Sequence, residues 1–274
     1  MGISNKYFLL NEDLIDVKYF EEDKIFQGKN LYEVIKVKEG VPLFYEKHIE
    51  RLHNSAKLTN LQPWISDSYI KEGLKKLIEA NEVEQGSLKF LLNFDKKSFL
   101  AFFEENNFPT EIQYEEGVAA ALYHRERVNP NAKVLNAEFR KDLDKFIKEK
   151  NIFEAILVDR NEDITEGSKS NVFVIKDEKV ITTPVKAVLP GTTRSTILEI
   201  CKEENIELIE KKLYYKEIEN IEGMFISSTP FDILPIKNID EINLASADNK
   251  VITTIMNAYR NKIKEYIKKD LNKQ

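Results

Sequence analysis

Residues 154–183, EAILVDRNEDITEGSKSNVFVIKDEKVITT, carry the densest β pattern in the chain. Apolar residues fill the stretches 154–159, 171–175 and 179–183, and the polar residues 176–178 separate the last two. Short apolar runs bounded by polar turns are typical of buried strands. The sequence therefore predicts a strand over 154–159 and a hairpin over 171–183.

Both flanks of this region combine strands with helices. Period-two and period-3.6 patterns predict further strands over 6–10, 32–37, 41–45, 88–92, 99–103, 118–123, 206–210 and 224–228. They predict helices over 46–58, 67–82, 135–150, 193–204, 215–220 and 251–268. Two β-rich halves that each carry helices indicate an α+β fold. No strand is followed by a dinucleotide-binding or P-loop glycine motif, which argues against a doubly wound nucleotide-binding sheet.

A polar stretch around Pro130, HRERVNPNA at 124–132, predicts a crossing between two domains. We expect a small α+β domain over 1–120, an interdomain crossing over 121–134 and a larger domain over 135–274.

Composition narrows the class of protein. The chain has 274 residues and a formal net charge of −6, which disfavours binding to nucleic acid. Cys201 is the only cysteine, so neither an internal disulfide nor a cysteine-based zinc site is expected. His48 and His53 lack the i, i+4 spacing of a helical zinc motif, and we expect no metal site. No apolar run is long enough to span a bilayer, and no secretory signal pattern is present. We expect a cytoplasmic enzyme or binding protein that does not bind membranes.

Two segments rich in hydroxyl groups are candidates for phosphate binding. Thr192 and Thr193 follow Pro-Gly at the start of the helix predicted over 193–204, and a helix N-terminus offers unpaired N–H groups to an anion. The alternative is a loop with a threonine N-cap. Ser228 and Thr229 follow the strand predicted over 224–228, where they could add donors or form an ordinary turn.

Three charged residues are candidates for chemistry. Only seven of the 41 basic residues are arginines, so an arginine is expected where a fork-shaped, permanently charged group is needed. Arg51 is either such a residue or a surface group paired with Glu46 or Glu50. Lys133 has apolar neighbours that could desolvate it and lower its pKa, as a lysine nucleophile requires, or it is a solvated lysine at a helix start. Glu166 is either a turn carboxylate or a fixed acid that faces a ring nitrogen.

Taken together and in this order, five motifs resemble the class IV (fold type IV) pyridoxal-phosphate aminotransferases. This family includes branched-chain aminotransferases, D-amino-acid transaminases and aminodeoxychorismate lyases. The resemblance runs from about Tyr32 to Pro235. The motifs are HIERL at 48–52, KVLN at 133–136, TEGSKSNVF at 165–173, LPGTTR at 189–194 and SSTPFDILP at 227–235.

The resemblance implies a fold and a set of roles. The fold is a small α+β domain and a larger β-barrel-like domain, with the site at the domain junction of a homodimer. The cofactor is pyridoxal 5′-phosphate, and the substrates are an amino acid and a 2-oxo acid. Lys133 is similar to the lysine that forms the internal aldimine, and Glu166 to the glutamate facing the pyridine nitrogen. Arg51 looks like the phosphate-binding arginine, with donors from Thr192, Thr193, Ser228 and Thr229, and Tyr32 falls on the substrate side.

The chain departs from the family pattern on the substrate side. Many members have an Arg-Gly step where this chain has Asn93-Phe94-Asp95, and no arginine occurs between Arg51 and Arg125. The arginine-x-histidine carboxylate trap of D-amino-acid transaminases is therefore missing. Residues 27–30, QGKN, replace a common Gly-Asp-Gly, and Glu138 stands where branched-chain enzymes have an aromatic residue. Three functions stay open: an aminotransferase, an aminodeoxychorismate-type lyase that eliminates pyruvate, and a non-catalytic binding protein on this fold.

Overall fold

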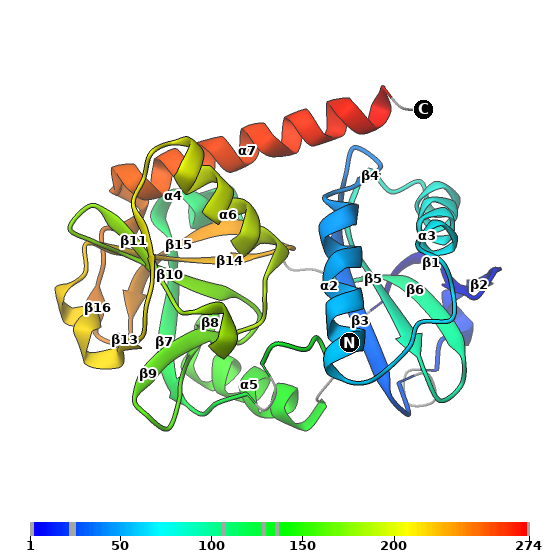
Figure 1. The fold of residues 1–274 in the computed structure, drawn as a ribbon, viewed down its shortest axis with the longest axis horizontal. Helices are drawn as coiled ribbons and strands as arrows, with labels where there is room; N and C mark the ends of the chain where they lie inside the picture. The colour runs from blue at the N-terminus through cyan, green and yellow to red at the C-terminus, as the bar shows by residue number, and fades with distance from the viewer. Residues whose placement is uncertain (1–2, 22–25, 106–107, 128–129, 135–136, 273–274) are drawn as a thin grey trace. The chain divides into compact units, whose positions relative to one another are not determined.

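The structure, a computed structural model, describes residues 3–21, 26–105, 108–127, 130–134 and 137–272. These residues group into two compact units (Figure 1). The first unit takes residues 1–107, 132–135 and 263–274, and the second takes 108–131 and 136–262. The chain thus enters the second unit earlier than the boundary expected at residue 120, because the strand over 118–124 pairs with strands of the second unit. The segment that carries Lys133 then returns to the first unit.

The first unit is built on an antiparallel six-stranded sheet in the order β2-β1-β6-β5-β3-β4, counted over the described residues. The strands are β1 (Ile3–Leu10), β2 (Asp13–Asp16), β3 (Asn30–Lys38), β4 (Val41–Pro42), β5 (Gln85–Asn93) and β6 (Ser98–Glu104). A 3-10 turn, η1 (Val17–Tyr19), follows β2. The strand predicted over 41–45 ends at Pro42, since Phe44 adopts a left-handed φ of 52° that directs the chain into a helix.

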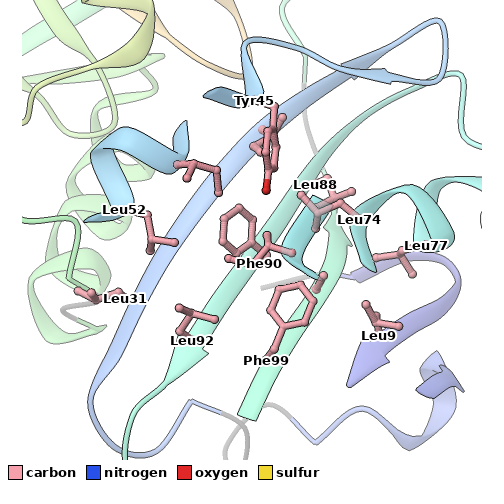
Figure 2. Close-up of a cluster of buried hydrophobic side chains, with 14 of the residues drawn as sticks. Leu9, Leu31, Tyr45, Leu52, Leu74, Leu77, Leu88, Phe90, Leu92 and Phe99 are labelled. Atoms are coloured by element: carbon pink, nitrogen blue, oxygen red, sulfur yellow. The ribbon is translucent and has the colours of Figure 1, made fainter. Parts of the chain in front are cut away.

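Two helices, α2 (Tyr45–Leu58) and α3 (Asp67–Asn81), cover one face of this sheet. Ser66 caps α3 by accepting a hydrogen bond from the Tyr69 amide at 3.2 Å, which explains why the helix begins there. Apolar residues at helical spacing meet alternate residues of the strands in one core (Figure 2). That core contains Leu9, Leu31, Ile35, Leu52, Leu74, Leu77, Leu88, Phe90, Leu92 and Phe99. The opposite face carries a smaller cluster of Phe8, Leu91, Leu100 and Phe102, with Tyr32 packed against it.

The second unit is a ten-stranded sheet over the described residues, and part of it closes into a ring. Its strands are β7 (Val118–His124), β8 (Glu154–Val158), β9 (Asp163–Gly167), β10 (Asn171–Lys176), β11 (Lys179–Thr182), β12 (Leu208–Glu210), β13 (Leu213–Tyr214), β14 (Gly223–Ser228), β15 (Asp232–Ile239) and β16 (Ile242–Asn243). Neighbours run β10-β14-β15-β7-β8-β9, and a further pairing of Glu166 with Asn171 joins β9 back to β10. The barrel-like second domain that the resemblance implies is therefore present.

Every strand of the ring contributes to one apolar interior. The interior includes Val118, Ala120, Ile156, Val158, Ile164, Val172, Val174, Met224, Ile226, Leu234 and Ile236. Strands β9 and β15 were not predicted, because DITEG is mostly polar and Pro235 interrupts the second stretch. Both strands form because they pair with neighbouring strands of the ring, and their own residue patterns do not predict them.

Helices surround this ring in the second unit. They are α4 (Glu111–Glu116), α5 (Ala137–Lys150), α6 (Thr192–Glu203) and most of α7 (Lys250–Leu271), with short 3-10 segments η2 (Val185–Ala187), η3 (Tyr215–Asn220) and η4 (Ser246–Asp248). Helix α5 packs Phe139 and Leu143 on Ala155 and Leu157 of β8, on the side opposite the interior. The expected helix start at 135–136 lies outside the described residues. Among the described helices, none combines the length and the apolar character needed to cross a membrane.

Phe90 tests the core of the first unit. Its side chain has no solvent exposure and its ring lies 6.1 Å from that of Phe99. We expect Phe90→Ala to lower the free energy of unfolding by about 3–5 kcal/mol, because it removes buried area and leaves a cavity. Tyr19→Ala is the control, since that side chain is 65% exposed, and its change should stay within about 0.5 kcal/mol. Chemical denaturation measures both, and equal effects would contradict the core assignment.

Candidate active site

Arg51 lies on α2 and is buried against β3, not solvated. Its Nε donates to Glu33 Oε1 at 2.8 Å and its Nη2 donates to Glu33 Oε2 at 2.5 Å. This two-pronged contact fixes the plane of the guanidinium. The carboxylate partner is thus Glu33 of the facing strand, and the alternative of a surface pair with Glu46 or Glu50 is wrong.

Glu33 also holds His48, and the three side chains form a buried charged network. His48 Nδ1 lies 2.8 Å from Glu33 Oε2. Burial opposes ionisation of Glu33, but the charges of Arg51 and Lys133 and the hydrogen bonds outweigh it and hold the pKa of Glu33 well below its usual range. Burial lowers the pKa of His48 to about 4. The network therefore contains an anionic Glu33, a cationic Arg51 and a neutral His48 near pH 7.

Lys133 belongs to the same cluster of the first unit. Its backbone N–H donates to Ser55 Oγ at 3.2 Å, and its carbonyl accepts from the Tyr32 amide at 3.5 Å. The neighbouring Val134 bridges to Leu31 of β3. The Lys133 ammonium lies 5.3 Å from the centroid of the Tyr32 ring. Lys133 is half-buried, next to a tyrosine face and within the field of Glu33, which excludes a fully solvated lysine.

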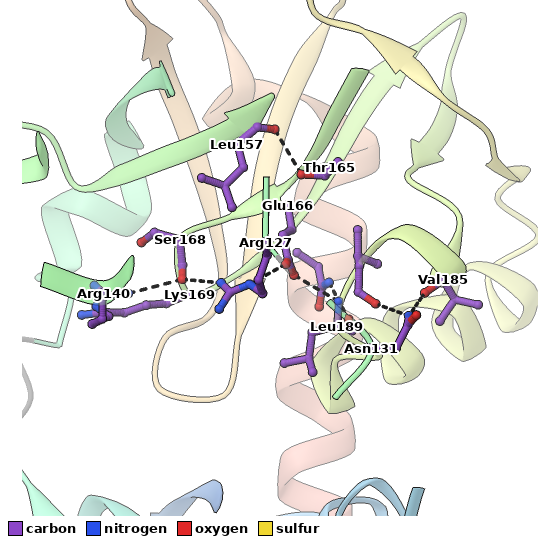
Figure 3. A network of polar contacts seen from close by, with 12 residues as sticks. Arg127, Asn131, Arg140, Leu157, Thr165, Glu166, Ser168, Lys169, Val185 and Leu189 are labelled. Atoms are coloured by element: carbon purple, nitrogen blue, oxygen red, sulfur yellow. Dashed lines mark hydrogen bonds and ion pairs between the residues drawn. The ribbon is translucent and has the colours of Figure 1, made fainter. Parts of the chain in front are cut away.

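Glu166 lies in β9 of the second unit, where the ring of strands closes. It is buried, which excludes a turn carboxylate. Oε1 accepts from Arg127 Nε at 2.9 Å, and Oε2 accepts from the Leu189 amide at 3.1 Å (Figure 3). Burial raises the pKa of Glu166, while Arg127 and the Leu189 N–H pull the pKa down.

A second buried carboxylate, Glu154, holds the turn after Glu166. It accepts from the Ser168 amide at 3.0 Å and from Ser170 Oγ at 2.8 Å. Gly167 permits the close approach of Ser170, because an added Cβ would lie 2.0 Å from Ser170 Oγ in this arrangement. These contacts hold the end of the strand that carries Glu166.

The predicted phosphate segments meet at the N-terminus of α6. Gly191 is the N-cap residue and has no side chain with which to cap the helix, so the alternative of a threonine N-cap is wrong. Thr192 Oγ1 lies 3.3 Å from Thr229 Oγ1, and Tyr259 hydrogen-bonds Thr193. Ser228 Oγ donates to the Lys169 carbonyl at 2.8 Å, so this hydroxyl anchors the turn after Glu166.

Leu189 links Glu166 to this helix. Its N–H binds Glu166, and its carbonyl accepts from Asn171 Nδ2 at 2.9 Å. An added Cβ on Gly191 would lie 2.0 Å from Asn171 Oδ1, so glycine permits the close approach. An acceptor carboxylate and a helix N-terminus with hydroxyl groups are thus tied together by residues 189–191. The helix N-terminus with its hydroxyl groups suits an anionic phosphate, and the carboxylate suits a ring N–H.

The structure sorts the predicted residues into two clusters. Arg51, Lys133 and Tyr32 lie together in the first unit, and Glu166, Thr192, Thr193, Ser228 and Thr229 lie together in the second. Sequence reasoning missed Glu33 and Arg127, the ionic partners of Arg51 and Glu166. The scarcity of arginine was a usable signal for Arg127, whereas Glu33 stands among 47 acidic residues and carried none.

The two segments that depart from the family pattern in sequence, residues 27–30 and 93–95, contact each other. Asn93 Nδ2 donates to the Gln27 carbonyl at 2.7 Å, and the Lys29 amide donates to Asp95 Oδ2 at 2.9 Å. An added Cβ on Gly28 would lie 2.6 Å from the same Asp95 oxygen. The end of β5 therefore clamps the loop before β3, and the replaced Arg-Gly and Gly-Asp-Gly steps form one structural unit.

The fold and the two clusters define a two-unit α+β protein with a closed, barrel-like second unit and a candidate phosphate and ring-nitrogen site. A sequence model of the family described as "Amino-transferase class IV" matches residues 30–239, which is most of the chain. The chain therefore belongs to the class IV aminotransferase family, a family of enzymes. Members of this family use pyridoxal phosphate.

Known proteins agree with this assignment. A D-alanine aminotransferase of Bacillus licheniformis is 29% identical over 257 residues, 88% of this chain and 90% of that protein. The branched-chain amino acid aminotransferase of Escherichia coli superposes with a TM-score of 0.80 at 21% identity, covering 95% of each chain. A putative 4-amino-4-deoxychorismate lyase of Legionella pneumophila gives 0.78 at 21% identity, covering 90% of this chain and 97% of that one. At these identities the two structural similarities establish the fold.

His48 gives the site a pH-dependent stability. The folded protein keeps His48 neutral down to about pH 4, while the unfolded chain binds a proton at the ordinary pKa of 6.5. The unfolded state therefore holds more protons between these values, so the free energy of unfolding falls as the pH falls through this window. We expect His48→Gln to be less stable than the wild type at pH 7.5 but to lose less on acidification to pH 5.

Denaturant unfolding at several pH values measures this slope. Leu58→Ala, at the end of α2, is the control, because that side chain is 53% exposed and carries no titratable group. It should keep the wild-type slope. Identical slopes for His48→Gln and the wild type would show that His48 is not held neutral.

Proposed function

We propose that this protein is a pyridoxal-phosphate-dependent aminotransferase that moves an amino group between an amino acid and a 2-oxo acid. The observation that carries the proposal is the coupling of Glu166, through Leu189, to the N-terminus of α6, where Gly191 is the N-cap residue. One feature suits a protonated ring nitrogen and the other suits a phosphate. The presence of both Lys133 and Glu166 supports catalysis over a purely binding role.

The residues of the two clusters take complementary roles toward the cofactor. In the second unit, Thr192, Thr193 and Thr229 and the first amides of α6 would hold the phosphate, while the Glu166 carboxylate would accept a hydrogen bond from the protonated ring nitrogen. In the first unit, Arg51 would add a guanidinium contact to the phosphate, and Glu33 keeps that guanidinium fixed in plane. When bound, pyridoxal phosphate supplies an electron sink for the bond that breaks at the substrate Cα.

Lys133 supplies the amine for the chemistry. With the cofactor bound, Lys133 Nζ would be the amine that anchors it, and the same amine would take up the proton from the substrate Cα and hold it for return. The Tyr32 ring lies against this ammonium and limits its contact with water. An ionised Glu166 would stabilise positive charge on a bound ring.

The same residues would serve elimination of pyruvate from an aminodeoxychorismate-type substrate. This second candidate is kept because the chain has Asn93-Phe94-Asp95 at the end of β5, with no arginine there that would select one reaction over the other. Purified protein incubated with L- and D-amino acids and either pyruvate or 2-oxoglutarate tests transamination. Pyruvate released from 4-amino-4-deoxychorismate without any acceptor would favour the lyase instead.

We further propose a homodimer, supported by the family resemblance and tested by light scattering of the loaded protein.

Covalent trapping tests the role of Lys133. We expect borohydride treatment of the pyridoxal-phosphate-loaded protein to fix the cofactor on Lys133 and to abolish the yellow colour. Lys133→Ala should lose turnover by several orders of magnitude while retaining phosphate contacts, because the covalent link and the proton carrier are the same amine. Peptide mapping identifies the modified lysine. A label on another lysine, such as Lys169 of the second unit, would refute the assignment.

Cofactor affinity tests the role of Arg51. We expect Arg51→Lys to weaken pyridoxal-phosphate binding by about ten- to a hundredfold, because Nε and Nη2 of Arg51 bond Glu33 and only a guanidinium has further N–H donors fixed in the same plane for a phosphate. The substitution also disturbs the ion pair with Glu33. Glu33→Gln is therefore the control, because it perturbs the same pair but keeps the guanidinium. Titrations in which both variants lose the same affinity would assign the effect to the ion pair and remove Arg51 from the phosphate site.

A further inference from the structure

Arg127 is the ionic partner of Glu166 within the described part of the chain, and it binds the carboxylate in a defined orientation. Nε donates to Glu166 Oε1 at 2.9 Å, and Nη2 of the same guanidinium donates to the Ser168 carbonyl at 3.0 Å (Figure 3). The guanidinium therefore spans the strand end and the turn that follows it. A lysine ammonium has no second donor in a fixed fork and cannot hold both groups in this way.

Neighbouring side chains keep the guanidinium in place. Its Cζ lies 5.4 Å from the centroid of the Phe139 ring, a distance at which cation–π attraction operates. Phe139 itself is buried between α5 and β8. Arg140, the next residue along α5, donates to the same Ser168 carbonyl at 3.3 Å and pairs with Asp144. Arg127 is thus supported from α5, although its side chain keeps 27% exposure.

The charges that face Glu166 oppose one another. Burial and the Glu154 carboxylate favour the neutral acid, whereas Arg127 and the Leu189 N–H favour the carboxylate. A guanidinium does not deprotonate in proteins, so its contribution is constant with pH. Each Glu166 oxygen carries one hydrogen bond from these donors, and a carboxylate oxygen can accept more than one. Acceptor capacity therefore remains for a ring N–H.

We propose that Arg127 is a positioning residue that keeps Glu166 ionised and aimed, and that it thereby sets the acidic limit of activity. The inference rests on the proposed function, in which Glu166 faces the pyridine nitrogen. Arg127 touches neither cofactor nor substrate in this proposal, and it acts through the Glu166 carboxylate. Within the part of the chain that the structure describes, removal of Arg127 leaves the Leu189 amide as the group that opposes burial and the Glu154 carboxylate.

A double-mutant cycle on the full chain without cofactor tests the coupling directly. Four proteins are compared: wild type, Arg127→Gln, Glu166→Gln and the double variant, with Arg140→Gln as the matched control that shares the Ser168 carbonyl but not the carboxylate. A buried acid with a raised pKa costs stability as the pH rises through that pKa. We therefore expect Arg127→Gln to lose more stability at pH 8 than at pH 5.

In the Glu166→Gln background the same substitution should lose equal stability at both pH values, because no charge remains to be balanced. Arg140→Gln should show no such pH dependence in either background. A pH-independent loss for Arg127→Gln in the presence of Glu166 would overturn the proposal, since a purely structural contact behaves in that way.

The loaded enzyme gives the second readout. We expect the acidic limb of the kcat profile to move upward by about 1–3 pH units in Arg127→Gln, the usual effect of one adjacent cation on a carboxyl. Arg127→Lys keeps a charge and should show a smaller displacement, which keeps the test usable if the glutamine variant folds poorly. An unmoved limb in both variants would overturn the inference while leaving the aminotransferase proposal intact. Absence of activity in the wild type would instead refute the proposed function, and the cofactor-free cycle would still decide the Arg127–Glu166 coupling.

Discussion

The second unit depends on one strand pairing, that of Glu166 with Asn171. This pairing joins β9 to β10 and converts an open sheet into a ring of strands around an apolar interior. It also buries the Glu166 carboxylate and places Asn171 where its amide binds the Leu189 carbonyl. The start of α6 follows directly from that contact. The strand pairing that closes the ring therefore also contributes to the geometry of the candidate site.

Two buried glutamates, one in each unit, face arginines, and their environments push their pKa values in opposite directions. Glu33 receives two hydrogen bonds from Arg51, a further one from His48 and the field of Lys133, so its pKa is depressed. Glu166 has one guanidinium bond and one amide bond, with Glu154 opposing them, so burial keeps its pKa raised. Glu33 is strongly favoured as an anion, which suits its contact with the Arg51 guanidinium. The ionised form of Glu166 is less strongly favoured, so its charge is more sensitive to groups placed near it.

The substrate side shows how a chain can depart from a family pattern without losing the fold. The side chains of Asn93 and Asp95 and the backbone of residues 27–29 hold one another at the end of β5. Both segments in this contact, residues 27–30 and 93–95, differ from the common family motifs. Asn93, Asp95 and the backbone of residues 27–29 thus form one connected unit of this chain.

The sequence alone determined most helices and strands, because their patterns are local: the hairpin over 171–183 and the amphipathic α2, α3 and α6 need only neighbouring residues to specify them. The motifs also determined the family and the cofactor-side candidates. Tertiary structure decided β9 and β15, whose own residues carry weak strand patterns. It also decided the partners of the charged groups. Arg127 lies 39 residues before Glu166, and Glu33 lies 18 before Arg51. Such pairs form only when strands and helices distant in sequence pack together, since the free energy of a buried ion pair depends on geometry and burial that no local pattern encodes.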